Sequence, residues 1–371
     1  MHYCKQCIIP STRPNIQFDH DGVCNACRAN EFKRKINWKE RERLFRTLVN
    51  KHQKKRPGYD CLIPVSGGKD SFWQVVKCLE YDMKPLTVTW KAPSQTALGG
   101  HNLRKLVELG VDHIDFQINP KVEKKFLLET FKTCGSSAVP MHMAIFHIPL
   151  QMALQFGISL ILWGENSALE YGGKQKEWDG STLDSVWFKK YGVTQGTSAT
   201  DWVSSRLTKK ELTPYFGAGP DAFKSKKLTA AFLGYYFPWD PLQSAKIARQ
   251  HGFQSRAQGP KTGWYDFADI DDDFISIHHF MKWYKFGFTR TFDNLSIEIR
   301  NGRMSRECAI EILKQRGDET PYEDIQKFCL FTGISRKKFF ELAERFRNPR
   351  VWKKSGGEWM IPGFLIKNWS W

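Results

Sequence analysis

The sequence SGGKDS at 66–71 combines hydroxyl, ammonium and carboxylate groups with two glycines, between an apolar run and a helical pattern. Glycines leave backbone N–H groups open to a phosphate, the serines add hydroxyl groups, and the lysine adds a compensating charge. The stretch does not fit the Walker A pattern, because no glycine lies six residues before Lys69 and an aspartate stands where that pattern has Ser or Thr. We predict a nucleotide-binding loop made of Ser66, Gly67, Gly68, Lys69, Asp70 and Ser71.

Asp70 is the unexpected member of this loop, because a carboxylate repels phosphate groups. Its presence is explained if it holds a cation such as Mg²⁺ beside the phosphates. The alternative is that Asp70 only caps the helix that follows. The sequence does not separate these two interpretations.

Four of the nine cysteines form two CxxC pairs, separated by sixteen residues that include two prolines and a glycine. Two such pairs can supply four thiolates to a tetrahedral zinc ion, and a site closed by four thiolates is structural. Disulfides are the alternative, but nothing in the sequence indicates an oxidising compartment. We predict a zinc ribbon with the ligands Cys4, Cys7, Cys24 and Cys27.

Short apolar runs alternate with helical patterns between residues 59 and 251, which predicts an α/β fold with a doubly wound parallel sheet. Because the first run leads into SGGKDS, we expect the loop at the carboxyl edge of the sheet, where open α/β sheets bind ligands. The expected strands lie at 61–65, 86–90, 112–118, 158–163 and 230–237. The expected helices lie near 70–82, 98–109, 121–133, 140–156 and 241–251.

Three further regions surround this pattern. Residues 165–227 form a long insertion rich in Gly, Ser and Thr, of the kind that often shapes a site. Residues 30–57 are charged and helix-like, and we expect them to pack through Trp38, Leu44, Phe45 and Leu48. Beyond about residue 270 the pattern is wholly helical, with segments near 271–287, 305–316, 321–331 and 335–346. We predict a zinc ribbon at 1–30, a helical connector at 31–57, an α/β domain at 58–260 and a mainly helical domain at 261–371.

The formal net charge is +17, from 56 basic and 39 acidic residues, and it predicts a positive surface that attracts anions. This surface is either a solvated basic face or a binding surface for a nucleic acid, a membrane or a phosphorylated substrate. The first residues, MHYCKQC, lack the pattern of a secretory signal, and the most apolar window, 147–163, is interrupted by Pro149 and Gly157. We therefore expect a soluble, cytoplasmic protein without a membrane span.

The sequence WGEN at 163–166 follows the fourth expected strand, so it should reach the same edge of the sheet as the loop. We expect Gly164 and Asn166 to contact the nucleotide and Glu165 to act in catalysis, whereas the alternative role of these residues is helix capping. His142 and His147 lie five residues apart, a poor spacing for one ligand face of a helix, and we interpret both as structural.

The loop resembles the PP-loop, the SGGxDS signature of the N-type ATP pyrophosphatases. Within that superfamily the chain resembles the N-acetyl sugar amidotransferases of surface-polysaccharide (O-antigen and nonulosonic acid) biosynthesis. The resemblance extends over nearly the whole length. It lies in the CxxC pairs, SGGKDS, LTVTWKAPSQT, LWGENSALEYGG at 162–173, FLGYYFPWD at 232–240 and HHFMKWYKFGFTR at 278–290.

This resemblance implies a PP-loop ATP pyrophosphatase fold and conversion of a sugar acetamido group into an acetamidino group. ATP would adenylate the amide oxygen, ammonia would attack the imidate carbon, and AMP would leave. Lys69, Asp70 and Glu165 would be catalytic, with Glu165 accepting a proton or anchoring the sugar. The cofactors would be ATP, Mg²⁺ and structural Zn²⁺. The expected sugar contacts are Glu165, Asn166, Glu170, Tyr171 and Asp240.

The chain shows no ammonia-producing site of its own, because His2 follows Met1 and none of the cysteines lies in a G-x-C-x-G turn. The resemblance implies a separate glutaminase subunit and a cyclase-like subunit that conducts the ammonia. The sugar would be nucleotide-linked, and no nucleic acid is expected.

A tRNA-modifying PP-loop enzyme, such as a thiolase or a lysidine synthetase, is the main alternative. The net charge, the zinc ribbon and the basic residues of 336–350 suit binding to a phosphate backbone. Against it, Cys61, Cys78 and Cys134 lack the spacing of a catalytic pair. A third interpretation is a nucleotide-binding regulatory subunit without turnover, which the intact loop disfavours.

Overall fold

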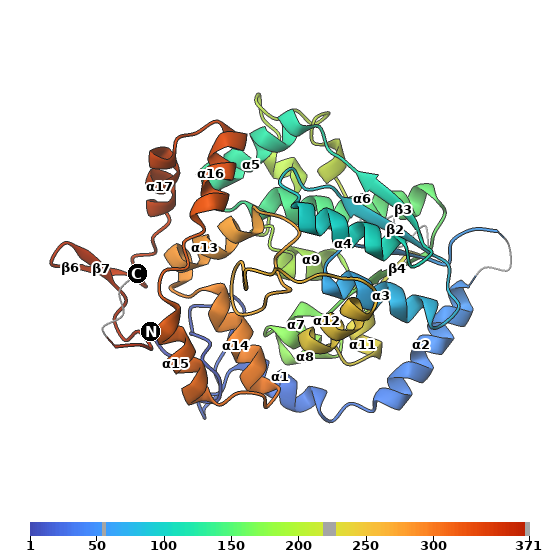
Figure 1. The fold of residues 1–371 in the computed structure, drawn as a ribbon, viewed down its shortest axis with the longest axis horizontal. Helices are drawn as coiled ribbons and strands as arrows, with labels where there is room; N and C mark the ends of the chain where they lie inside the picture. Colours follow the sequence, from blue (N-terminus) through green and yellow to red (C-terminus); the bar gives the residue numbers. More distant parts are fainter. Residues whose placement is uncertain (54–56, 218–227, 368–371) are drawn as a thin grey trace.

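A parallel sheet with helices on both faces forms the centre of the molecule (Figure 1). The computed structural model describes residues 1–53, 57–217 and 228–367. The sheet has the strand order β3-β2-β1-β4-β5, so the chain starts in the middle and moves outward in both directions, which confirms the predicted α/β class. The strands are β1 (Cys61–Pro64), β2 (Pro85–Trp90), β3 (Asp112–Phe116), β4 (Leu160–Trp163) and β5 (Thr229–Phe232).

Alternate residues of the strands face opposite layers of helices, as the pleat of a strand requires. Ile63 of β1 belongs to the core on one face, whereas its neighbour Leu62 belongs to the core on the other. One face is covered by α2 (Trp38–His52), α3 (Lys69–Leu79), α4 (Ala97–Val107) and α12 (Pro241–Gln250). The other face is covered by α5 (Pro120–Cys134) and α6 (Ala138–Gln155).

Two expectations about these elements were wrong in detail. Of the four residues expected to pack α2, Leu44 is 41% exposed, whereas Phe45 is buried and Leu48 packs against the same core; buried Val49 was not expected. The strand expected at 230–237 ends at Phe232, where the chain turns into the short helix α11 (Leu233–Tyr236).

The insertion after β4 contains only short elements among its described residues. These are α7 (Ser167–Glu170), α8 (Gln175–Trp178), α9 (Ser185–Tyr191), η1 (Ala199–Trp202) and η2 (Thr213–Tyr215). Residues 218–227 of the predicted insertion lie outside the described residues. None of the helices in the described ranges has the length and apolar character needed to cross a bilayer.

The carboxy-terminal region is mainly helical, but the prediction of a wholly helical pattern was wrong. A small hairpin follows the helices and turns at two glycines with positive φ, Gly356 (+56°) and Gly357 (+91°), a conformation that glycine adopts without strain. The elements are α13 (Ile275–Phe286), α14 (Arg290–Arg300), α15 (Arg306–Arg316), α16 (Tyr322–Thr332), α17 (Arg336–Glu344), β6 (Lys353–Ser355) and β7 (Glu358–Met360).

The amino-terminal cysteine region packs on these carboxy-terminal helices rather than on the sheet (Figure 1). Its buried side chains share a core with Phe288, Phe292 and Leu295, and α1 (Asn25–Lys33) continues from the second cysteine pair. The Arg306 guanidinium donates to the carbonyl of Cys7 (3.1 Å). The two ends of the chain therefore form one side of the molecule.

Candidate functional site

The SGGKDS loop connects β1 to α3 and is braced by its own hydroxyl groups. The backbone N–H of Ser66 donates to Ser71 Oγ (3.0 Å), and that of Gly68 donates to Ser66 Oγ (3.2 Å). Gly67 has a φ of +84°, and a Cβ atom there would lie 2.7 Å from the backbone nitrogen of Leu103 in α4. A side chain at this position is therefore excluded both by conformation and by contact with α4.

The loop opens into a cavity of about 420 Å³, here called the loop cavity. It lies where β1 and β4 are neighbours, which is the point at which the order of the sheet reverses and where ligands bind in such folds. The sequence brings both strand ends here as predicted: Ser66, Asp70 and Ser71 line the cavity after β1, and Gly164 and Glu165 line it after β4.

Asp70 is fixed by two donors rather than left free to cap α3. Lys69 Nζ contacts one carboxylate oxygen at 2.6 Å, and the indole N–H of Trp239 donates to the other at 2.9 Å. The N-cap position of α3 is Gly68, which offers no side-chain cap. These contacts favour a role in the cavity for Asp70 over helix capping.

Three further carboxylates line the loop cavity, and they come from Asp269, Asp271 and Asp272 in the segment that precedes α13. Burial raises the pKa of Asp271, and it raises that of Asp272 to about 6. Burial, followed by the charge of Asp70, raises the pKa of Glu165 to about 7. Mg²⁺ is often held by one or two carboxylates together with substrate phosphates. Among the described residues, these carboxylates form no group of three or more whose oxygens lie close enough to share one ion. The carboxylates that line the loop cavity are Asp70, Glu165, Asp269, Asp271 and Asp272.

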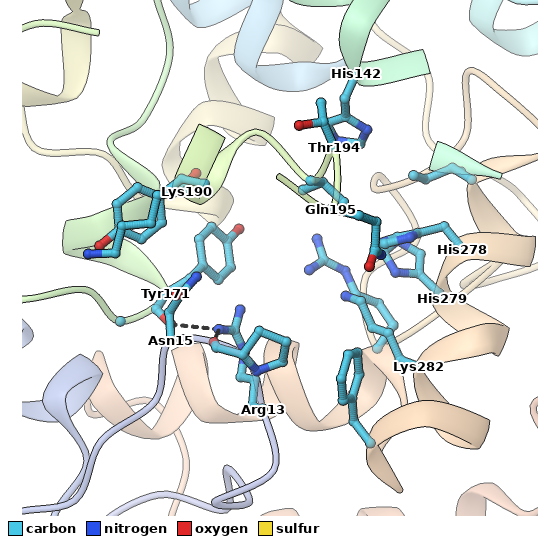
Figure 2. A pocket seen from close by; sticks show the side chains of 18 of the residues that line it. Arg13, Asn15, His142, Tyr171, Lys190, Thr194, Gln195, His278, His279 and Lys282 are labelled. Carbon is cyan, nitrogen blue, oxygen red and sulfur yellow. Dashed lines mark hydrogen bonds between the residues drawn. The ribbon is translucent and has the colours of Figure 1, made fainter. Parts of the chain in front are cut away.

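A second cavity of about 530 Å³ adjoins the first, and we call it the basic cavity (Figure 2). Figure 2 shows side chains from the amino-terminal region, the insertion and α13 that surround a common space. Its walls include Tyr171, whose ring lies under the guanidinium of Arg13 at 5.7 Å. The basic side chains that line it are Arg13, Lys189, Lys190, Lys282 and Arg290, and the histidines are His142, His278 and His279.

The two cavities share part of their walls. Glu165, His142, Asp269 and Ile275 line both of them. Glu165 follows β4, His142 lies on α6 and the other two residues lie at the start of the carboxy-terminal region, so three distant parts of the chain form this junction. A group held in one cavity can therefore reach a group held in the other at the Glu165 carboxylate.

Burial favours the uncharged form of His142 at the junction and of His278 and His279 beside it. Burial lowers the pKa of His142 to about 4 and holds that of His278 well below its ordinary value. Burial also lowers the pKa of His279 to about 4, although Asp269 lies 3.3 Å away and opposes the shift. Neutral imidazoles can accept or relay a proton, whereas an imidazolium would repel an incoming ammonium ion.

His142 was interpreted from the sequence as structural, yet it lines both cavities. The five-residue spacing indicates only that His142 and His147 do not share one face of their helix. The actual neighbour of His142 is His278 on α13, with ring centroids 6.3 Å apart. The pair of histidines in HHFMKWYKFGFTR was the available signal. His147 instead packs against the ring of Phe188, away from the junction.

Six of the expected site residues do not line either cavity: Gly67, Gly68 and Lys69 of the loop, and Asn166, Glu170 and Asp240. Asn166 is 2% exposed, caps α7 through its oxygen and donates to the carbonyls of Glu177 and Gly180. Glu170 accepts from Lys33 Nζ at 2.6 Å. These contacts use the polar atoms that a substrate would need.

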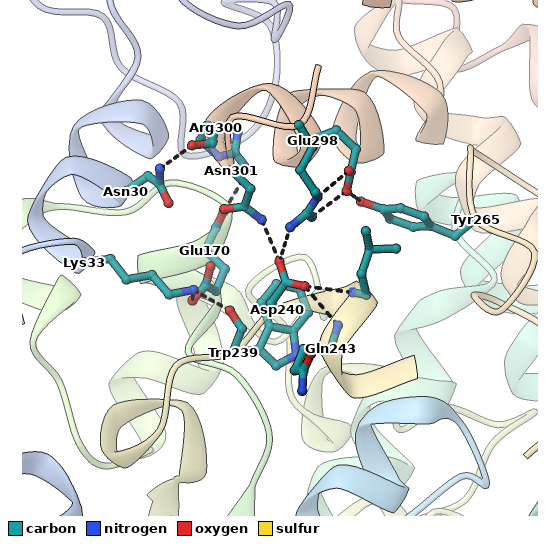
Figure 3. A network of polar contacts seen from close by, with 12 residues as sticks. Asn30, Lys33, Glu170, Trp239, Asp240, Gln243, Tyr265, Glu298, Arg300 and Asn301 are labelled. Carbon is teal, nitrogen blue, oxygen red and sulfur yellow. Dashed lines mark hydrogen bonds and ion pairs between the residues drawn. The ribbon is translucent and has the colours of Figure 1, made fainter. Parts of the chain in front are cut away.

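Asp240 belongs to a network that joins four parts of the chain (Figure 3). One oxygen caps α12, and the other accepts from Asn301 Nδ2 (2.9 Å) and Arg303 Nη1 (2.7 Å). Lys33 also donates to the backbone carbonyl of Trp239, the residue whose indole N–H donates to Asp70. The network therefore supports the loop cavity from outside.

The four predicted cysteine ligands come together in the amino-terminal region. All four are buried and free, and their sulfur atoms lie within 4.8 Å of one another. The Cys4–Cys27 and Cys7–Cys24 sulfur atoms are 3.9 and 3.7 Å apart, far longer than a disulfide bond. A zinc ion with bonds of about 2.3 Å places tetrahedral sulfur ligands about 3.8 Å apart, so this cluster fits such an ion.

Comparison with known proteins gives one family match, which lies in the carboxy-terminal region. Residues 262–363 match the family described as "LPS biosynthesis protein WbpG-like, C-terminal domain". This match confirms the resemblance to surface-polysaccharide proteins. The matched region includes α13 and α14, which line the basic cavity. No curated protein matches the chain.

One of the solved structures that match gives a distant likeness. The structure of NMN synthetase from Francisella tularensis matches with 12% sequence identity and a TM-score of 0.32, over 72% of this chain and 94% of that chain. A likeness of this kind says nothing about the reaction of the present chain.

Proposed function

We propose that the chain is an ATP-dependent amidotransferase that converts an acetamido group of a sugar into an acetamidino group and releases AMP and pyrophosphate. The observation that carries this proposal is the junction at Glu165, His142 and Asp269, where the loop cavity and the basic cavity meet. ATP would occupy the loop cavity and the sugar the basic cavity. Substrates bound in adjoining cavities can react without leaving the protein.

The reaction has two steps. In the first, the acetamido oxygen attacks the α-phosphorus of ATP, the bond to the β-phosphate oxygen breaks, and pyrophosphate leaves while the amide nitrogen loses its proton. In the second, ammonia adds to the imidate carbon, loses a proton and expels AMP. ATP is needed because an amide oxygen is a poor leaving group, whereas AMP is a good one.

The loop residues and the junction would divide this work. The backbone and hydroxyl groups of 66–71 would hold the phosphates, and Lys69 would offset their charge. A magnesium ion held by Asp70 and a neighbouring carboxylate would neutralise the phosphates in the same place. Glu165 would take the proton from the attacking ammonia, and the Tyr171 ring would contact the sugar.

The family match supports a place in lipopolysaccharide biosynthesis, such as assembly of the O-antigen. We take the ammonia to come from a separate glutaminase, delivered by a cyclase-like subunit. The cysteine cluster would hold one structural zinc ion. The protein would act in the cytoplasm.

The direct test is incubation of the purified chain with ATP, Mg²⁺, ammonium and di-acetamido nucleotide sugars, followed by mass spectrometry. The expected product has lost one oxygen and gained NH, with one AMP and one pyrophosphate for each amidine. Asp70→Ala should abolish turnover through loss of the metal, while Lys69→Ala should keep residual activity. Formation of ADP and orthophosphate as the sugar-dependent products would contradict the proposal.

A further inference from the structure

Three cations of the basic cavity converge on one buried carboxylate, Asp293, whose side chain is only 1% exposed. Arg13 Nε lies 2.7 Å from Asp293 Oδ1, Lys282 Nζ lies 3.2 Å from Oδ2, and Arg290 Nη1 lies 3.6 Å from Oδ2. Burial opposes ionisation of Asp293, yet these three cations hold its pKa well below the ordinary range. The carboxylate therefore fixes three positive groups in one wall of the cavity.

The positive charge of this wall is only partly balanced. Arg290 also approaches Asp269, with Nε 3.4 Å from the carboxylate, so two carboxylates face three cations. The pKa of Lys282 is lowered to about 8, mainly by burial; Asp293 opposes the shift, and Arg290 and Arg13 add to it. A bound anion would relieve both the desolvation and the repulsion that these groups experience.

Arg13 is held in place before any ligand arrives. Its Nη1 group donates to the carbonyls of Tyr171 (2.9 Å) and Pro14 (3.2 Å), and its Nε group is engaged with Asp293. Among the described residues, no hydrogen-bond partner contacts its Nη2 group. A guanidinium fixed on one side and free on the other loses little entropy when it binds an anion.

We propose that Arg13, Lys282 and Arg290 form a binding site for an oxyanion carried by the sugar acceptor, either a phosphate or a carboxylate. The inference rests on the proposed function, because it names the class of acceptor that the basic cavity takes. The anion bound on this wall would act as an anchor, and the acetamido group would extend from it toward Glu165.

The site is distinct from the one that would hold the phosphates of ATP. The loop cavity is lined by five carboxylates and none of the three cations, whereas the basic cavity shares only Asp269 and Glu165 of that set. Nucleotide phosphates in the loop cavity would need a metal ion, while an anion in the basic cavity meets protein cations directly. The difference in lining charge would therefore direct metal-bound ATP to the loop cavity and the anionic sugar to the basic cavity.

The test is a calorimetric titration of the full-length protein whose loop cavity is occupied by Mg²⁺ and the non-hydrolysable analogue α,β-methylene-ATP. The probes are UDP-N-acetylglucosamine, N-acetylglucosamine 1-phosphate, glucuronate and neutral N-acetylglucosamine, at one ionic strength. We expect the anionic probes to bind at least about ten-fold more tightly than the neutral sugar. Comparison of the affinities for N-acetylglucosamine 1-phosphate and glucuronate shows whether the site prefers a phosphate or a carboxylate.

Single substitutions should show whether these three side chains bind the anion. Arg13→Gln, Lys282→Gln and Arg290→Gln should each weaken binding of the preferred anion about ten-fold and leave the neutral sugar unaffected. Lys337→Gln on exposed α17 makes the same charge change outside the cavity and should have no effect. Equal affinity for charged and neutral sugars, or unchanged affinity in all three variants, would overturn the inference.

Conservative variants keep the test decisive if a glutamine variant fails to fold with Asp293 left short of a partner. Lys282→Arg keeps the charge and should retain affinity within about three-fold, with unfolding temperature checked for each protein. The outcomes also separate the two proposals. If the protein binds the anion through these three cations but forms no amidine, only the proposed reaction is contradicted. Amidine formation without dependence on the wall would contradict only this inference.

Discussion

At the scale of single residues, Glu165 gives a prediction about pH. Burial and the charge of Asp70 raise its pKa to about 7, so the free protein holds a proton there below neutral pH. If Glu165 accepts the proton of ammonia, kcat/KM should rise with pH through an apparent pKa near 7 and then level off. The measurement is amidine formation between pH 5.5 and 8.5 with the concentration of free NH₃, rather than total ammonium, held constant.

The control is Glu165→Gln, which should lose most of the activity and the rise near pH 7 together. Because the folded pKa lies above the ordinary value of a carboxyl group, ionisation in the folded state costs stability as pH rises from about 4.5 to 7. The Gln variant should therefore unfold at a higher temperature than the parent protein at pH 8, but not at pH 4. A pH profile unchanged in the variant would rule out this role.

The site residues that the sequence predicted best are those whose chemistry is local. SGGKDS identifies itself within six positions, and WGEN reaches the same cavity because both segments follow neighbouring strands. Asn166 and Asp240 were expected at the site, but an amide or carboxylate after a strand caps a helix equally well, and the sequence does not separate these roles. The sequence holds no indication of the role of Arg13, because that role depends on Asp293, which lies 280 residues further along the chain.

At the scale of elements, the turn between β1 and α3 must pass α4 without a side chain. Gly67→Ala would place a Cβ atom 2.7 Å from the backbone of Leu103 at a φ of +84°. We expect a loss of about 2–4 kcal/mol in stability and loss of ATP binding, from backbone strain plus the clash. Chemical unfolding and calorimetry with ATP analogues would measure both.

Gly110→Ala is the matched control for that variant. Gly110 has a φ of +96°, but a Cβ atom there meets nothing within 4 Å. It should cost only the strain, about 1 kcal/mol, and leave nucleotide binding intact. If both variants lose the same stability and keep ATP binding, the close approach of α4 to the loop is unimportant.

The cysteine region gives a second prediction at this scale, because it carries Arg13 into the basic cavity. We expect metal analysis to find one zinc per chain, and its removal by a chelator to lower the unfolding temperature by several degrees. Loss of the metal should also weaken binding of the anionic acceptor about ten-fold, as Arg13→Gln does, with kcat at saturation changed little. An unchanged acceptor affinity in the stripped protein, or an iron–sulfur chromophore, would contradict this.

Helix α14 was not among the helices predicted from the sequence, and its surroundings explain why. Its buried residues include the polar Thr291, Asp293, Asn294, Ser296 and Glu298 together with the apolar Phe292, Leu295 and Ile297, so the helix is enclosed by both polar and apolar surroundings. Phe292 and Leu295 pack in the apolar core of the cysteine region, whereas Asp293 between them contacts the cations of the basic cavity. Buried polar residues therefore interrupt the apolar periodicity from which a packed helix is predicted. Four strands of the sheet lie within about two residues of their expected bounds, whereas the last was expected to extend to 237 and ends at Phe232.

At the scale of the whole molecule, the net charge of +17 is compatible with a nucleic acid or with a small anion as the partner. Part of it is concentrated in the basic cavity, where five lysines and arginines surround a space of about 530 Å³. A cavity of this kind suits a small anion, whereas tRNA needs an open surface that follows a phosphate backbone. The distribution of charge thus favours a small phosphorylated or carboxylated acceptor over a nucleic acid.

The salt dependence of binding decides between these partners. If the surface binds tRNA, affinity should be strong at low salt and fall steeply between 50 and 200 mM, because each neutralised phosphate releases counterions. We expect weak RNA binding, and amidine formation that is unchanged after nuclease treatment. Lys282→Gln should reduce the reaction with the sugar without changing residual RNA binding, since the lysine lies inside the cavity and not on an open surface. ATP turnover that requires tRNA, in a protein inert toward every acetamido sugar offered with ammonium, would make the chain an RNA-modifying enzyme instead.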